Sequence, residues 1–93
     1  MIGSVASRFD KLARSEERWR GYLENIRAKD SQSLARLYDE TSSILYGLAF
    51  RMLTDPAEAE EVILEVYQRI WTAHSFDAAQ GSVLAYLTVL TRS

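Results

Sequence analysis

The sequence contains no cysteine, one proline, one histidine and four glycines among its 93 residues. Without cysteine, disulfides and thiolate metal sites are excluded, so the composition is compatible with a reducing cytoplasm. No apolar run approaches the roughly 18 to 20 residues of a membrane-spanning helix, and residues 1–10 lack the apolar segment of a secretory signal. The remaining composition, 47% apolar and 26% charged, favours one folded domain located in the cytoplasm.

The residue types needed for catalysis or metal binding do not cluster. His74, the only histidine, has no histidine or carboxylate partner at metal-ligand spacing, so we interpret it as a loop residue. Asp39 and Glu40 are neighbours on a predicted helix and point about 100° apart, which favours a solvated face over acid–base chemistry. There is no glycine-rich phosphate loop. We therefore expect no enzymatic activity, no cofactor and no metal site.

Scarce glycine, a single proline and the lack of period-two alternation predict an all-α fold. We expect a compact bundle of three main helices and a fourth C-terminal helix. The predicted domain spans residues 15–93, whereas residues 1–14 are predicted to be a basic N-terminal arm or a short helix. The predicted N-caps of the four helices are Ser15, Asp30, Asp55 and Ser82.

The third predicted helix, residues 56–73, has the clearest start. Asp55 suits the N-cap, Pro56 suits the first helical position, and Glu58 stands where a capping box places its glutamate. Its apolar residues fall on two nearly opposite sides. One side holds Ala59, Val62, Ile63, Val66, Ile70 and Ala73, and the other holds Leu64, Tyr67 and Trp71. Two interpretations of the second side stay open: it packs within the bundle, or a partner covers it.

Leu64 is surrounded on this helix by polar side chains, those of Glu60, Glu61, Glu65 and Gln68. Packing this surface inside the bundle would bury several carboxylates, so we expect it to be exposed to water. An apolar centre with an acidic rim has the anatomy of a protein-binding hot spot. Residues 1–29 carry a net charge of +3 and residues 30–93 carry −5. The acidic part favours a basic protein partner over duplex DNA as the first contact.

Residues in four segments, in order, carry a resemblance to a known family: 30–38 (DSQSLARLY), 49–55 (AFRMLTD), 59–67 (AEEVILEVY) with Ile70-Trp71, and the C-terminal set Phe76-Asp77, Gly81-Ser82 and 86–93 (YLTVLTRS). Together they resemble region 2 of bacterial sigma factors of the extracytoplasmic function (ECF) group, over residues 16–93. The resemblance implies a transcription initiation factor domain. Such a domain binds the clamp helices of the largest subunit of the RNA polymerase core enzyme and helps to recognise and melt the −10 promoter element.

The third helix carries the polymerase-binding surface in this family. The resemblance therefore implies that Glu60, Glu61, Leu64, Glu65 and Gln68 bind the core enzyme, which is the acidic surface already described. Glu61 keeps the charge of the family's usual aspartate on a longer side chain. Leu64 replaces the usual glutamine, which removes a hydrogen-bonding amide.

The segment 86–93 resembles the family's Trp-Leu-x-x-Ile-Ala-Arg-Asn motif, which implies that Tyr86, Arg92 and Ser93 contact DNA. Recognition of this kind captures unstacked bases, for which aromatic and basic side chains are suited. The rest of the family's promoter-reading loop would lie beyond residue 93, and the family's −35-reading domain has no counterpart in these residues, so we expect promoter DNA to bind this chain weakly. Whether the chain is a fragment of a longer sigma factor stays open. A half-buried Tyr86 and a solvated helix-end Arg92 are the competing interpretation. The resemblance also allows an anti-sigma factor as a further partner.

A function of a different class also stays open: a diverged helical protein-interaction module that no longer supports transcription. Leu64 and the acidic charge of the matched part are the features in its favour. A helix-turn-helix DNA binder is disfavoured, because neither of the last two predicted helices is a basic recognition helix. The sequence does not determine the promoter, the inducing signal or the oligomeric state.

Overall fold

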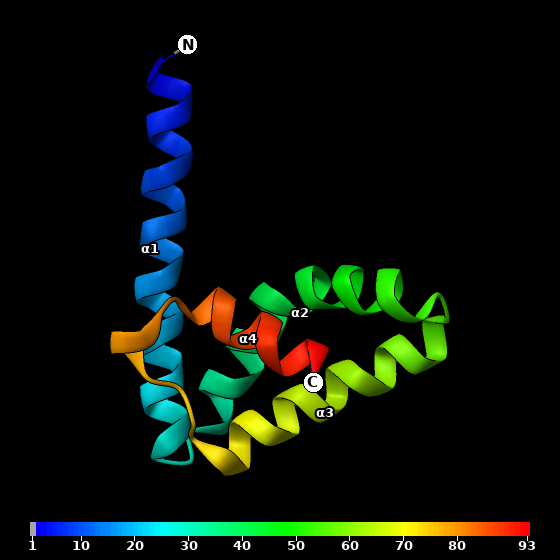
Figure 1. The fold of residues 1–93 in the computed structure, drawn as a ribbon. Helices are drawn as coiled ribbons and strands as arrows, with labels where there is room; N and C mark the ends of the chain where they lie inside the picture. Colours follow the sequence, from blue (N-terminus) through cyan, green and yellow to red (C-terminus); the bar gives the residue numbers. More distant parts are fainter. Residues whose placement is uncertain (1) are drawn as a thin grey trace.

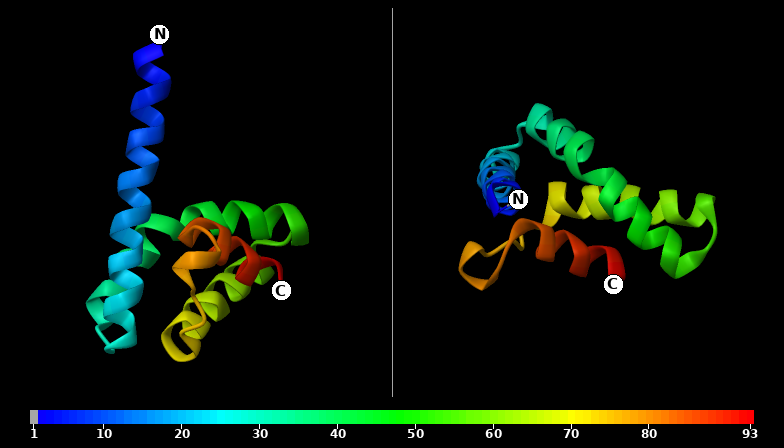
Figure 2. Two further views of the ribbon diagram at one scale, coloured as in Figure 1. Left: turned by 60° about the vertical axis from the view of Figure 1, so that its left-hand side comes forward. Right: turned by 90° about the horizontal axis from the view of Figure 1, so that it is seen from above.

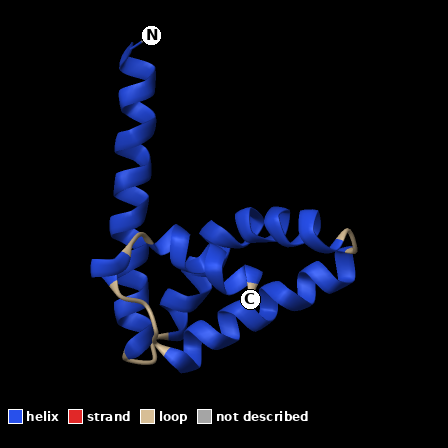
Figure 3. Cartoon of the chain, in the orientation of Figure 1, coloured by secondary structure: helices blue, strands red, loops and turns tan. Residues whose placement is uncertain are grey.

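The structure is a computed structural model that describes residues 2–93, with the side chains of residues 8–93. It consists of four α-helices, joined by short loops, and one 3₁₀ turn (Figures 1 and 3). The predicted all-α bundle is confirmed for this part of the chain. The elements are α1 (Ile2–Arg27), α2 (Ser31–Leu53), α3 (Pro56–Ala73), η1 (Ala78–Gln80) and α4 (Val83–Arg92).

Helices α2 and α3 form a hairpin whose connecting turn lies far from α1 (Figure 1). Helix α1 stands across the open end of this hairpin, and its N-terminal half extends beyond the other helices (Figure 1 and the left view of Figure 2). Helix α4 packs on all three of the longer helices. The last residue, Ser93, contacts α3 through a hydrogen bond from Arg69.

Three of the four predicted N-caps are confirmed by hydrogen bonds to side chains. Asp30 accepts from the backbone N–H of Gln32, and Asp55 accepts from the N–H groups of residues 57 and 58. Ser82 Oγ accepts from the N–H of Ala85 at 3.0 Å. Each cap satisfies donors that lack an intrahelical partner, which is why these short polar residues begin helices.

The predicted N-cap at Ser15 is wrong, because α1 runs without a break from Ile2 to Arg27. Residues 9–14 contain neither glycine nor proline, and Phe9 and Leu12 continue the helical spacing, so the helix propagates through Ser15. Both apolar side chains are exposed there, Phe9 by 69% and Leu12 by 47%. Met1 lies outside the described residues, and the division into an arm and a domain at residue 15 stays a prediction.

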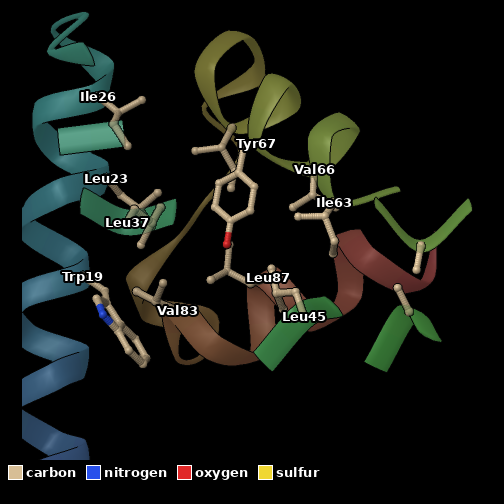
Figure 4. Close-up of a cluster of buried hydrophobic side chains, with 13 residues drawn as sticks. Trp19, Leu23, Ile26, Leu37, Leu45, Ile63, Val66, Tyr67, Val83 and Leu87 are labelled. Atoms are coloured by element: carbon tan, nitrogen blue, oxygen red, sulfur yellow. The ribbon is translucent and has the colours of Figure 1, made fainter. Parts of the chain in front are cut away.

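The hydrophobic core draws side chains from all four helices (Figure 4). Tyr67 reaches into the middle of the cluster (Figure 4), although the sequence placed it on the second side of its helix. The buried apolar residues are Trp19, Leu23, Ile26, Leu37, Leu45, Ala49, Ala59, Ile63, Val66, Tyr67, Ile70, Val83 and Leu87.

Helix α1 is tied to α2 by a polar cluster around Glu40. One carboxylate oxygen accepts from Arg18 Nε at 2.8 Å and from Trp19 Nε1 at 3.1 Å, and the other accepts from the Tyr22 hydroxyl at 2.8 Å. The hydrogen bond from Arg18 contributes most to lowering the pKa of Glu40. The expected solvated face is therefore correct for Asp39, which is exposed, and wrong for Glu40, which is half-buried. Adjacent residues of a helix point in different directions, and only Glu40 faces α1.

The loop between α1 and α2 is tied to the C-terminal end of α3. Lys29 Nζ donates to the backbone carbonyl of Trp71 at 2.6 Å and lies 4.6 Å from the centre of the Trp71 ring. A cation at the C-terminal end of a helix satisfies a free carbonyl and complements the helix dipole. The contact also covers part of the indole face, which is a favourable cation–π arrangement.

Candidate protein-docking and nucleic-acid surfaces

One side of α3 presents a continuous polar surface with an apolar centre, as the sequence predicted. All five of its residues are exposed, including Leu64, which is 56% exposed. Among the side chains that the structure describes, the only salt bridge joins Arg18 to Glu40, so the carboxylates on α3 form no salt bridge with another described residue. We call Glu60, Glu61, Leu64, Glu65 and Gln68 the α3 docking surface.

The two edges of the α3 docking surface border different hollows. Glu60 faces a groove of about 360 Å³ toward α2, where it lies with Tyr38 and Tyr46. Glu65 faces a groove of about 210 Å³ toward α4, where it lies with Arg92. Leu64 therefore lies on a convex ridge of α3 between the two grooves and not in a pocket. Glu60 borders the groove on one side of it, and Glu65 borders the groove on the other.

The second apolar side of α3 was predicted either to pack within the bundle or to be covered by a partner, and its three residues do not all behave alike. Tyr67 is buried and packs edge-on against Tyr38, with ring centres 4.9 Å apart. Trp71 is half-buried and is partly covered by Lys29. Both aromatic residues thus pack within the bundle, and only Leu64 of this side remains free for a partner.

The three predicted DNA-contacting residues do not lie together. Tyr86 is half-buried: its ring centre lies 5.3 Å from that of Phe76, and its hydroxyl lies 2.9 Å from Ser75 Oγ. Arg92 and Ser93 are exposed at the other end of α4. Six residues of helix separate Tyr86 from Arg92, which places them about 120° apart around α4. No single side of α4 presents both.

Ser93 already has partners within the chain. Its hydroxyl accepts from Arg69 Nη1 at 3.1 Å and donates to the carbonyl of Leu90 at 3.0 Å. The serine side chain therefore closes the C-terminal turn of α4 against α3.

Tyr86 borders a larger groove between α1 and the loop that follows α3. This groove has a volume of about 610 Å³ and is lined by the aromatic pair Phe76 and Tyr86 and by charged groups of both signs, namely Arg20, Glu24, Arg27 and Asp77. The two arginines were not predicted as site residues, because only tertiary packing places α1 beside this loop. Their spacing of seven residues, which puts them on one side of a helix, was the available signal.

His74 ends α3 in a left-handed backbone conformation, with φ of 50°, and is half-buried at the edge of this groove. Its interpretation as a loop residue is confirmed. In the part of the chain that the structure describes, no three histidine, aspartate or glutamate side chains gather as a metal site would require. Within the same residues, no helix has the length and apolarity to cross a bilayer.

Comparison with known proteins decides the family. Residues 37–93 match the family described as Sigma-70 region 2. The chain belongs to the sigma-70 region 2 family. It is 39% identical over 69 residues to the ECF RNA polymerase sigma factor SigK of Mycobacterium tuberculosis strain H37Rv, an alignment that covers 73% of this chain and 37% of that protein. The SigK of Mycobacterium sp. strain KMS is 38% identical over 69 residues, which cover 73% of this chain and 36% of that relative.

These matches confirm the resemblance found in the four segments: this sigma-70 region 2 domain is of the ECF type. They also agree with the observed all-α fold. The domain spans just over a third of the length of the curated relatives that it matches.

Proposed function

We propose that this sigma-70 region 2 domain acts in transcription initiation by binding the RNA polymerase core enzyme through the α3 docking surface. The observation that carries the proposal is the exposure of Leu64 within a ring of unpaired carboxylates. An exposed aliphatic centre supplies apolar contact area, and the acidic rim steers a basic partner and fixes its register. The clamp helices of the largest polymerase subunit, which the family resemblance implies as the partner, would lie along this ridge.

We further propose that α4 contributes to recognition and melting of the −10 element, with Tyr86, Arg92 and Ser93 as the contacting residues. The support is the groove at Tyr86, which is lined by a second ring, that of Phe76, and by two arginines of α1 beside the carboxylates of Glu24 and Asp77. Aromatic rings stack on unpaired bases and cations follow the phosphate backbone. Because Tyr86 and Arg92 face different sides of α4, the isolated domain should bind promoter DNA weakly.

Retention of purified core polymerase by the immobilised domain at moderate salt tests the first proposal. The double variant Glu61→Lys with Glu65→Lys should weaken retention by about 2 to 5 kcal/mol if both charges are desolvated at the contact, and by much less if they lie on its rim. Glu17→Lys with Asp39→Lys is the matched control, since it makes the same change in net charge at exposed positions off α3. Equal retention of all three proteins would remove the α3 docking surface from the account.

A second candidate function is a helical protein-interaction module that has diverged from transcription. The observation in its favour is Leu64, a 56% exposed aliphatic residue where the family usually has glutamine. This candidate predicts that even the unmodified domain does not retain core polymerase at moderate salt. Partners beyond the polymerase and DNA, including an anti-sigma factor, stay predictions, as does location in the cytoplasm.

A further inference from the structure

A carboxylate of α1 holds the beginning of α4. Glu16 Oε1 accepts from the backbone N–H of Val83 at 2.7 Å, and Oε2 accepts from the N–H of Leu84 at 2.9 Å. Both oxygens of one side chain are therefore engaged by consecutive amides, 67 and 68 residues away in the sequence. Glu16 is half-buried, so water competes only partly for these hydrogen bonds.

The contact completes the hydrogen bonding of the first turn of α4. Helices begin with N–H groups that have no intrahelical acceptor. Here Glu16 accepts from the first two, Ser82 Oγ accepts from Ala85, and the Ser82 carbonyl accepts from Tyr86 at 3.1 Å. Two of the three N–H groups that side chains cap thus find their acceptor on a different helix, and a negative charge at this end also complements the helix dipole.

The surrounding structure fixes both ends of this contact. On the α1 side, Trp19 and Tyr22 donate to Glu40 of α2 within two turns of Glu16. On the α4 side, Gly81 has φ of 151° and ψ of −168°, a conformation accessible essentially only to glycine. The glycine turns the chain immediately before Ser82, so that the first amides of α4 are presented to α1.

We infer that Glu16 is a positioning residue that fixes the start and direction of α4, and so links the placement of Tyr86 to α1. Tyr86 is the fourth residue of α4, within the turn that Glu16 and Ser82 cap. The functional half of this inference rests on the proposed role of α4 in −10 recognition. The structural half, capping of α4 by Glu16, stands independently of that role.

Amide NMR of the full 93-residue chain tests the capping. The amide resonances of Val83 and Leu84 should shift together as the Glu16 carboxylate is titrated with acid, and Glu16→Gln should abolish that shared titration. The same variant should raise hydrogen exchange at these two amides about five- to tenfold, the scale of losing a helix cap. Glu17→Gln is the control, because Glu17 is exposed and makes no hydrogen bond to any side chain or amide that the structure describes. A titration that persists in Glu16→Gln would overturn the inference.

A binding experiment tests the functional half. A complex of the domain with core polymerase is titrated with single-stranded −10 DNA, using the unmodified domain, Glu16→Gln and Glu17→Gln. We expect Glu16→Gln to retain core polymerase fully and to bind the DNA several-fold more weakly, while Glu17→Gln matches the unmodified domain. Unchanged DNA affinity of Glu16→Gln would overturn the positioning role even if the amides show the cap. If the unmodified domain does not retain the polymerase, the proposed function is rejected. The functional half of the inference then falls with it, whereas the capping of α4 by Glu16 is unaffected.

Discussion

The hydroxyl groups of Thr41 and Tyr67 lie 2.5 Å apart in the buried interior between α2 and α3. Thr41 Oγ1 also lies 2.6 Å from the carbonyl of Leu37, which can only accept. A threonine hydroxyl has one hydrogen, so it donates to Leu37 and accepts from Tyr67. The Tyr67 phenol enters the middle of the hydrophobic core (Figure 4). Its hydroxyl is thus satisfied there by a threonine of the facing helix.

This pair should show strong coupling in a double-mutant cycle. Tyr67→Phe removes one hydrogen bond and should lower the free energy of unfolding by about 1 kcal/mol. Thr41→Val leaves the Tyr67 hydroxyl buried without an acceptor and should cost about 1 to 3 kcal/mol. The double variant should cost less than the sum of the two, since it leaves no orphaned hydroxyl. Urea unfolding gives the free energy of unfolding of all four proteins. Additive costs of the two substitutions would contradict the hydrogen bond from Tyr67 to Thr41.

The same tyrosine should make the domain sensitive to alkaline pH. Burial raises the pKa of Tyr67 to about 12, above its ordinary value of 10.0. A pKa that is higher in the folded state gives stability that is fully present below pH 10 and is lost as the pH rises through 12. The loss is up to about 2 to 3 kcal/mol for a shift of this size. We expect the difference in free energy of unfolding between the unmodified domain and Tyr67→Phe to fall across this window. Taking the difference between these two proteins removes the contributions of all other titrating groups, because both proteins retain them.

Glu40 should contribute the opposite pH dependence. Its pKa lies below the ordinary value of 4.5, chiefly because of the hydrogen bond from Arg18. A pKa that is lower in the folded state gives stability that is present above about pH 4.5 and is lost as the pH falls through the folded-state pKa. Glu40→Gln should remove this loss and should cost about 1 kcal/mol at neutral pH, because the cluster is partly open to water. Asp39→Asn, one residue away and exposed, should change stability by less than about 0.5 kcal/mol. Thermal unfolding between pH 3 and pH 7 separates the two variants.

Two glycines should respond in opposite directions to alanine. At Gly81, with φ of 151°, alanine should cost about 1 to 3 kcal/mol through backbone strain alone, since a methyl group there meets no atom within 4 Å. Gly47 lies inside α2 and also has room for a methyl group. Alanine at Gly47 should stabilise the domain by about 0.5 to 1 kcal/mol, because a helix interior favours alanine. A stabilising Gly81→Ala, measured by urea unfolding, would contradict the observed turn before α4.

Local rules in the sequence were sufficient for most of the secondary structure. Asp55 and Pro56 begin α3, and Ser82 begins α4, because a cap acts on amides only two or three residues away. The same rule failed at Ser15, where favourable helix formers on both sides outweighed a residue that suits a cap. A residue that suits an N-cap marks a position where a helix can begin. It does not force a helix to begin there.

The contacts that sequence reasoning missed are those between residues far apart in the chain. Glu16 directly follows the residue that suited an N-cap in the sequence, and it caps α4, a helix far along the chain. Glu40 was interpreted as solvated, and it receives three side chains of α1. No periodic pattern in the sequence indicates the partners of Glu16 or of Glu40, because these contacts depend on how α1 crosses the α2–α3 hairpin. The α3 docking surface, by contrast, was predictable, since one helix supplies all its residues and the 100° step fixes their arrangement.

Leu64 should separate stability from binding. Because it is 56% exposed, Leu64→Ala should change the free energy of unfolding by less than about 0.5 kcal/mol. If Leu64 is the apolar centre of the α3 docking surface, the same variant should weaken binding to core polymerase by about 1 to 2 kcal/mol. Val89→Ala is the matched control, because Val89 is 65% exposed on α4 and lies outside that surface. Urea unfolding and a titration against core polymerase give the two quantities for each variant. Equal affinities of Leu64→Ala and Val89→Ala would move the energetic centre of docking from Leu64 to the carboxylates around it.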